Sequence, residues 1–262
     1  MKPFSPPIAA LVTGASRGIG RVIAMRLAER GVRVALHYRS NREAAEAALA
    51  QLAGTGHGIF AADLADPAAT TRLWREIIER WGAIDVLVNN AGLYVEHAPL
   101  TTPYESWKSA WQLTLAANLV GPANLSLLAA QHMAARDTPL NDSFGRGRIV
   151  NISSRGAFRG EPDCPAYAAS KAGLNALSQS LAKALAPRAI YVYCLAPGWV
   201  ETEMAASHLR GPDGAAILAQ HPLRRVTRTD EVANTAMYCA LEAPAAMTGC
   251  VIDVNGASYL RT

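Results

Sequence analysis

The chain has 262 residues, half of them apolar and 18% charged, with a formal net charge of +4. This length suits one large α/β domain or two small ones, with enough apolar residues for a substantial core. The charge is modest and spread along the chain, so nucleic-acid binding is not indicated, and no run of eighteen apolar residues predicts a membrane span.

The N-terminus and the cysteines exclude two further classes of protein. Met1-Lys2-Pro3-Phe4 lacks an apolar signal core, so we expect a cytoplasmic location. The four cysteines have no C-x-x-C spacing and no histidine cluster beside them, which argues against a disulfide framework and predicts no metal site. Buried thiols are the expectation, although Cys164 lies close enough to Tyr167 in the sequence to line a cleft.

Short apolar runs alternate with helical patterns along the whole chain. Parallel strands need crossover helices, and right-handed crossovers place those helices on both faces of a sheet. No linker-like stretch or internal repeat divides the chain, so we expect a single domain, 1–262, built on a doubly wound parallel sheet. The predicted strands are Ile8–Val12, Val32–Leu36, Ile59–Ala62, Ile84–Val88, Ile149–Ile152, Ile190–Ala196 and Val251–Val254.

A glycine-rich turn follows the first predicted strand. It reads T-G-x-x-x-G-x-G from Thr13 to Gly20, and apolar residues then recur at helical spacing. A strand, a turn and a helix N-terminus in this order present backbone N–H groups and a helix dipole to a phosphate. Alone, the same pattern also suits a simple tight connection.

The first half of the chain contains one helix start signal and two positions at which asparagines suggest a role. Asp66-Pro67 has the form of an N-cap and a first helical residue, and predicts a helix that runs to about Trp81. After the fourth strand comes Asn89-Asn90-Ala91-Gly92, at the carboxyl edge where open α/β sheets bind ligands. Asn118 then lies inside an apolar helical stretch and needs a polar partner or a water.

A tyrosine and a lysine share one predicted helix in the second half. Pro165 or Ala166 opens this helix, so Tyr167 and Lys171 lie four residues apart on one face. A cation beside the ring favours the phenolate and would lower the pKa of the tyrosine toward neutrality. Ser154 precedes Tyr167 by a loop of twelve residues that can return the chain, so both hydroxyls can meet in one cleft. The plain alternative is a lysine that snorkels past a half-buried ring.

Two segments of irregular composition complete the chain. Residues 136–147, before the fifth predicted strand, are mostly polar and turn-forming. Such a segment is long for a connection between a helix and a strand, so we expect a surface excursion. After Pro197-Gly198, the stretch 203–228 carries prolines, glycines and scattered apolar residues. We expect this stretch to be a mobile lid over a mainly nonpolar substrate cleft.

Taken together, these motifs resemble the short-chain dehydrogenase/reductase family from about Ile8 to Tyr259. They are T-G-x-x-x-G-x-G, N-N-A-G, S-x12-Y-x3-K and P-G, in the family's order. The C-terminal V-N-G-x-x-Y pattern is most similar to that of the 3-oxoacyl-[acyl-carrier-protein] reductase type. One departure is Tyr191-Val192-Tyr193, where the family leads us to expect a basic residue and an asparagine.

The resemblance implies a Rossmann-like NAD(P) site. No acidic residue follows the second strand, whereas Tyr38, Arg39 and Ser40 do, and Arg17 lies in the glycine-rich turn. Arginine binds phosphate through paired donors, so we predict NADP in preference to NAD. Asp63 would contact the adenine, or would only form a turn. The full predicted cofactor set is Gly14, Ser16, Arg17, Gly18, Ile19, Gly20, Tyr38, Arg39, Ser40, Asp63, Leu64, Asn90, Ala91, Gly92, Tyr167, Lys171, Pro197, Gly198, Val200 and Thr202.

The resemblance also implies a catalytic set of Asn118, Ser154, Tyr167 and Lys171. Tyr167 would be the proton donor, Ser154 would polarise a carbonyl, and Lys171 would tune the tyrosine. Asn118 would hold a water beside Lys171, or would instead be a satisfied core residue. The same resemblance implies that Asn89 braces neighbouring strands. It also implies a homotetramer or homodimer, the assemblies common in the family.

Three functions remain open from the sequence. The first is NADPH-dependent reduction of a 3-oxoacyl thioester, a small-molecule substrate carried by an acidic protein. The second is NADP-dependent oxidation or reduction of another alcohol or ketone, such as a sugar, steroid or xenobiotic. The third is a cofactor-binding regulator without turnover, against which the complete catalytic set argues.

Overall fold

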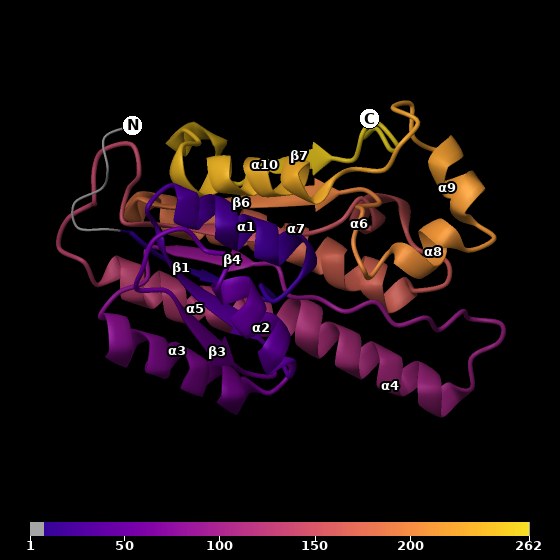
Figure 1. Ribbon diagram of the computed structural model, residues 1–262, viewed down its shortest axis with the longest axis horizontal. Helices are drawn as coiled ribbons and strands as arrows, with labels where there is room; N and C mark the ends of the chain where they lie inside the picture. Colours follow the sequence, from indigo (N-terminus) through magenta and orange to yellow (C-terminus); the bar gives the residue numbers. More distant parts are fainter. Residues whose placement is uncertain (1–7, 262) are drawn as a thin grey trace.

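The computed structural model describes residues 8–261 of the chain. The expectation drawn from Met1 to Phe4 lies outside the described residues. Within the described part the chain folds as an α/β unit whose central sheet carries helices on both faces (Figure 1).

The central sheet has seven strands, all parallel, in the order β3-β2-β1-β4-β5-β6-β7. This is the predicted doubly wound sheet, and each predicted apolar run forms a strand with bounds shifted by at most two residues. The order reverses next to β1, between β1 and β4, and there the crossovers change face. The strands are β1 Ala9–Val12, β2 Arg33–Tyr38, β3 Gly58–Ala61, β4 Val86–Asn89, β5 Gly147–Ile152, β6 Ile190–Pro197 and β7 Val251–Val254.

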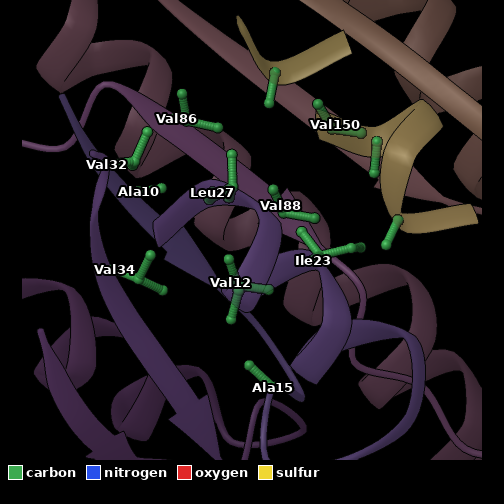
Figure 2. Close-up of a cluster of buried hydrophobic side chains, with 14 of the residues drawn as sticks. Ala10, Val12, Ala15, Ile23, Leu27, Val32, Val34, Val86, Val88 and Val150 are labelled. Atoms are coloured by element: carbon green, nitrogen blue, oxygen red, sulfur yellow. The ribbon is translucent and has the colours of Figure 1, made fainter. Parts of the chain in front are cut away.

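Both faces of the central strands are buried, so these strands supply side chains to two cores, whereas the edge strand β7 is only partly buried. On β1, Ala10 and Val12 lie in one hydrophobic cluster, whereas Ala9 and Leu11 lie in the other. The first cluster includes Ile23 and Leu27, which pack over β1 beside Val88 (Figure 2). A strand buried on both sides reads as a continuous apolar run, which is why these runs were recognisable in the sequence.

The helices divide between the two faces of the sheet. Helices α1, α2 and α10 contribute to the first cluster, and α3, α5 and α7 to the second. The α-helices are α1 Gly18–Glu29, α2 Arg42–Leu49, α3 Pro67–Trp81, α4 Tyr104–Leu115, α5 Gly121–Ala134, α6 Gly156–Arg159, α7 Pro165–Leu185, α8 Ala206–Arg210, α9 Gly214–Ala219 and α10 Thr229–Leu241. A π-helix, η1 Ala116–Val120, joins α4 to α5, and two 3-10 turns are η2 Ala186–Arg188 and η3 Ala245–Met247.

Local capping signals place two of these helices as predicted. The Asp66 side chain accepts a hydrogen bond from the Ala68 N–H, and α3 runs from Pro67 to Trp81. Helix α7 begins at Pro165. Both prolines occupy a position whose N–H would have no partner inside the helix.

The expectation of a surface excursion over 136–147 is wrong in part. Phe144 is buried in the first hydrophobic cluster, and the Asn141 side chain accepts from the Phe144 N–H at 2.8 Å to form the turn. The buried Arg148 guanidinium donates to the Ser143 carbonyl at 2.8 Å and to the Cys239 carbonyl at 3.1 Å. The turn is therefore anchored to the core, and a polar composition did not reveal that anchor.

The departure from the family pattern on β6 is a matter of packing. Tyr193 is fully buried, and its hydroxyl lies 3.3 Å from the carbonyl oxygens of Ala243 and Pro244. The Arg148 guanidinium lies 5.8 Å from the centre of the Tyr193 ring. Arg148 and Tyr193 lie inside β5 and β6, before the carboxyl ends that the predicted site residues follow, so the departure concerns core packing.

One helical stretch, Tyr104–Ala134, is long and apolar enough to cross a membrane by length and composition alone. Core helices of soluble proteins pass the same test. Here the stretch packs against α3 and α7, and 44% of its most apolar window is buried inside the fold.

Candidate active site

The predicted site residues gather at the carboxyl edge of the sheet. They follow the ends of β1, β2, β3, β4, β5 and β6, and the start of α7 contributes the tyrosine and lysine. Because all strands are parallel, their carboxyl ends meet at one edge, as the sequence analysis expected.

The glycine-rich turn between β1 and α1 requires its glycines. Gly14 and Gly18 have φ angles of +62° and +54°, a conformation that L side chains rarely adopt. At Gly20 a Cβ atom would lie 2.4 Å from the Gly14 carbonyl oxygen and from the Asn90 side chain. The backbone here packs too closely for any side chain, so the turn has a fixed shape.

Thr13 and Asn90 fix the glycine-rich turn to the end of β4 through side-chain hydrogen bonds. The Thr13 hydroxyl accepts from the N–H groups of Asn90 and Ala91, both at 2.9 Å. The Asn90 amide donates to the carbonyls of Thr13 at 2.9 Å and Gly14 at 3.2 Å. Sequence analysis missed Thr13, although its place directly before the glycine-rich turn was the available signal. Asn90 supports the turn through its side chain, whatever its contact with a cofactor.

The N-terminus of α1 has the features of a phosphate site. No side chain caps it, since Arg17 occupies the cap position without a capping hydrogen bond. The first backbone N–H groups of a helix lack partners within the helix and carry the positive end of its dipole. With Gly18 in the turn, these residues fit the pyrophosphate of a dinucleotide.

The exposed arginines near this turn have different surroundings. The Arg17 guanidinium lies 3.3 Å from the Glu203 carboxylate, and both side chains are about two-thirds exposed. Arg39 and Ser40 are exposed at the end of β2, whereas Tyr38 is buried. Asp63 accepts from the Ala65 N–H at 2.9 Å, which is the turn-forming role considered as its alternative.

A buried histidine, His37, connects the turn to β3 and was also missed. The Gly14 N–H donates to Nδ1 at 3.1 Å, and Nε2 lies 3.0 Å from the Ala62 carbonyl. Nε2 therefore carries the proton in the neutral ring. Burial lowers the pKa of His37 to about 4, against smaller opposing effects of the Ala62 carbonyl and Asp63. The ring stays neutral at physiological pH and supports the turn.

Ser154 and Tyr167 come together as the loop between β5 and α7 predicts. Burial raises the pKa of Tyr167 to about 12, and a side-chain hydrogen bond from Ser154 acts in the opposite direction. The Ser154 hydroxyl also accepts from the Gly156 N–H at 3.0 Å, which fixes the hydroxyl at the end of the strand. The two hydroxyls can thus approach one oxygen of a ligand.

Lys171 lies on the same face of α7 as Tyr167 and is buried. Its Nζ donates to the Ile152 carbonyl at 2.7 Å and lies 5.8 Å from the centre of the Tyr167 ring. Burial lowers the pKa of Lys171 to about 8. A cation is therefore present beside the ring at neutral pH, as expected. The expectation that this cation lowers the pKa of Tyr167 is wrong here: burial raises that pKa to about 12, and the opposing contribution comes from the Ser154 hydrogen bond.

Asn118 lies in the π-helix η1 and is fully buried. Its Oδ1 accepts from the Leu93 N–H at 2.9 Å, while Nδ2 donates to the Leu93 carbonyl at 2.9 Å and lies 3.3 Å from the Ser170 hydroxyl. A Cβ at Gly92 would lie 3.5 Å from both Asn118 Oδ1 and Lys171 Nζ. Asn118 is thus close to the lysine and has its side chain satisfied by protein.

Asn89 meets its expectation. Its amide donates to the Ser126 hydroxyl at 3.1 Å and to Asn151 Oδ1 at 2.8 Å, which links β4 to α5 and β5. Cys164, by contrast, is fully buried and lines no open cleft.

The predicted lid segment contacts the site through aromatic rings. It contains α8 and α9, and His208 on α8 packs against Tyr94 with ring centres 5.8 Å apart. Tyr94 in turn packs edge-on against Tyr167 at 5.1 Å. Next to the segment, Val200 is buried, and the Thr202 methyl would lie 3.6 Å from a Cβ at Gly18. Sequence analysis did not identify Tyr94.

Metal-ligating side chains do not gather anywhere in residues 8–261. No group of three or more His, Cys, Asp or Glu side chains there is placed to hold an ion.

Comparison with known proteins gives concordant matches over nearly the whole chain. A family model described as "Enoyl-(Acyl carrier protein) reductase" matches residues 14–257. A Staphylococcus aureus 3-oxoacyl-[acyl-carrier-protein] reductase FabG is 35% identical over 253 residues, which are 96% of this chain and 98% of that protein. The Escherichia coli K12 protein of the same name is 36% identical over 251 residues, 96% of this chain and 97% of that protein.

Proposed function

The chain belongs to the short-chain dehydrogenase/reductase family and is an NAD(P)-dependent oxidoreductase, and from this premise we propose that it reduces the 3-oxo group of an acyl thioester with NADPH. The observation that carries the proposal is the convergence of Ser154 and Tyr167 beside the buried Lys171. Two hydroxyls on one oxygen suit a carbonyl, which needs a hydrogen bond as it polarises and a proton as it becomes an alcohol.

The residues of this chain would divide the reaction among them. Ser154 donates a hydrogen bond to the carbonyl oxygen, and Tyr167 gives its proton to the same oxygen as negative charge develops there. A pKa of about 12 keeps Tyr167 protonated, as the reductive direction requires. The Lys171 ammonium favours the phenolate that remains. NADPH, when bound, supplies the hydride.

The cofactor preference rests on charge at the end of β2. Arg39 is exposed there, no carboxylate follows the strand, and Arg17 lies in the phosphate-binding turn. A carboxylate at this place would accept from both ribose hydroxyls of NAD and repel a 2′-phosphate. Two exposed guanidiniums instead favour NADP over NAD.

The substrate class is supported by the relatives. Their names state reduction of 3-oxoacyl groups on acyl carrier protein, and they match nearly the whole chain. The description of the family model names the reduction of an enoyl group instead. We favour the 3-oxo group because the site offers two hydroxyls to one oxygen. The net charge of +4 also suits an acidic carrier protein.

Two further features belong to this proposal. The segment 203–228 would close over the substrate, since α8 already contacts the Tyr94 ring beside Tyr167. A homotetramer or homodimer is supported by apolar side chains exposed along α4 to α5, where Leu113, Val120 and Leu127 are 42–54% accessible. A cytoplasmic location stays a prediction from the sequence.

The test is NADPH oxidation, followed by absorbance, with three substrates at matched concentrations. They are acetoacetyl thioester on acyl carrier protein, crotonyl thioester on the same carrier, and a simple ketone without a thioester. We expect turnover with the first, because it alone presents a 3-oxo group on the carrier. Turnover confined to the crotonyl thioester or to the simple ketone would refute the proposed substrate. The second of these results would favour the other alcohol and ketone dehydrogenases considered above.

A further inference from the structure

Helix α7 carries Tyr167 in its first turn, and the Cys164 carbonyl accepts from the Tyr167 N–H at 3.0 Å, but the cap side chain offers no acceptor to the N–H that precedes it. The cap position is Cys164, which makes no side-chain capping bond, and Pro165 has no N–H. The next donor is the Ala166 N–H, which is buried. It donates to Nε2 of His97 at 3.1 Å, a residue 69 positions away in the sequence.

The hydrogen bonds of His97 define which nitrogen accepts. Its Nδ1 lies 2.7 Å from the Val95 carbonyl, so Nδ1 carries the proton and Nε2 is the acceptor. The side chain is 1% exposed and packs edge-on against the Trp107 ring, with centres 5.2 Å apart. The Trp111 ring lies 6.4 Å away on the same helix. His97 is thus held in one orientation by contacts on its ring and on both nitrogens.

A second contact joins the same two segments. The His97 backbone N–H donates at 2.8 Å to the carbonyl of Asp163, which precedes the cap residue of α7. At its other end the segment 93–97 is bonded to Asn118 through both backbone groups of Leu93. This short segment therefore links Asn118 on η1 to the first turn of α7.

We propose that His97 is a positioning residue for Tyr167, acting through the hydrogen bond from the Ala166 N–H to its Nε2. The catalytic part of this inference rests on the proposed function, in which Tyr167 is the acid. Tyr167 follows Ala166 directly, so any relaxation that finds the Ala166 N–H another partner moves the tyrosine. Displacement of a reacting group by about 1 Å can reduce a rate by about 100-fold.

Three variants separate this role from a general contribution to the core. His97→Phe retains a ring for the tryptophans but removes the acceptor. His97→Gln restores a side-chain acceptor of similar reach. His57→Phe is the matched control, because His57 also accepts from a backbone N–H, that of Val34 at 3.1 Å, but at the start of β2.

Two measurements are made on each variant. The first is kcat, KM and the NADPH dissociation constant in the thioester assay, well below the melting temperature. The second is amide hydrogen exchange at Ala166 to Ala168, compared with amides of β5. The second measurement needs no substrate, so it reports on the hydrogen bond from the Ala166 N–H to His97 even if the proposed function fails.

For His97→Phe we expect kcat to fall by about 10- to 100-fold, with NADPH affinity within about twofold and faster exchange confined to the start of α7. His97→Gln should recover most of kcat and most of the protection from exchange at the start of α7, and His57→Phe should change neither of these quantities. Unchanged exchange at Ala166 in His97→Phe would overturn the proposal. So would a kcat within about twofold of the parent, or an equal loss in the glutamine variant. If the parent protein shows no turnover but His97→Phe still alters exchange at the start of α7, the proposed function is refuted, and the structural role of His97 at the start of α7 remains supported.

Discussion

Tyr167 and Lys171 share one face of α7, and burial acts on them in opposite directions. It raises the pKa of the phenol to about 12 and lowers that of the ammonium to about 8. In each case burial disfavours the charged form. The acid is therefore protonated throughout the usual assay range, and the group whose charge changes within that range is the lysine.

This difference predicts how the reduction depends on pH. As the pH rises through about 8, Lys171 loses the charge that favours the phenolate left after proton transfer, so kcat/KM should fall above that pH. Lys171→Arg retains its charge at high pH and should show a lower but flatter profile. The measurement is kcat/KM for acetoacetyl thioester from about pH 6 to pH 10. A parent profile that stays level across this range would contradict the role given to Lys171.

A second prediction at this scale concerns Arg39. Arg39→Asp replaces a phosphate donor with a carboxylate that accepts from ribose hydroxyls, so the KM for NADPH should rise by about 10- to 100-fold. The KM for NADH should stay level or fall. Steady-state kinetics with both cofactors measure this, with Arg75→Asp as a control, because Arg75 is exposed on α3. An equal change for both cofactors would remove Arg39 from cofactor selection.

Other residues show where reasoning from sequence stops at this scale. The type of residue at positions 90, 97 and 118 is visible in the sequence, but its partner is not. Asn90 bonds across 77 residues to Thr13, and His97 across 69 residues to Ala166. Such contacts exist only once the sheet has brought the segments together, so no local pattern predicts them.

At the scale of elements, local signals were sufficient for most of the fold. The central strands are recognisable because both of their faces are buried, and α3 and α7 because a proline occupies the first turn of each. The π-helix η1 has no comparable signal. Its extra residue per turn falls where Asn118 bonds to Leu93, so tertiary contacts, and not propensity, account for its position.

The turn at Phe144 is the counterpart of that success. Its polar neighbours predicted a surface excursion, and most of them are exposed. One aromatic residue and Arg148 nevertheless fix the turn to the core. The composition of a polar segment does not reveal a single buried residue that anchors it to the core.

At the scale of the whole molecule, the sheet explains why residues distant in sequence form one site. Parallel strands carry the glycine-rich turn, Asn90, Ser154 and the 197–202 loop to one edge, on both sides of the point where the strand order reverses. The cofactor half of the site comes from the first strands, and the proposed catalytic half from β5 and α7. The sequence predicted a doubly wound parallel sheet with motifs at its carboxyl edge, and the strand order that brings them together is seen in the structure.

The most direct test of the central claim is NADPH oxidation with acetoacetyl thioester by the parent protein and by Tyr167→Phe, with NADPH binding measured on both. The phenylalanine retains the ring that packs on Tyr94 and lacks only the proton donor. We predict that NADPH affinity stays within about twofold while kcat falls by at least about 100-fold, the scale of general acid catalysis. Near-normal turnover by Tyr167→Phe would contradict the account, because the proton would then come from another group.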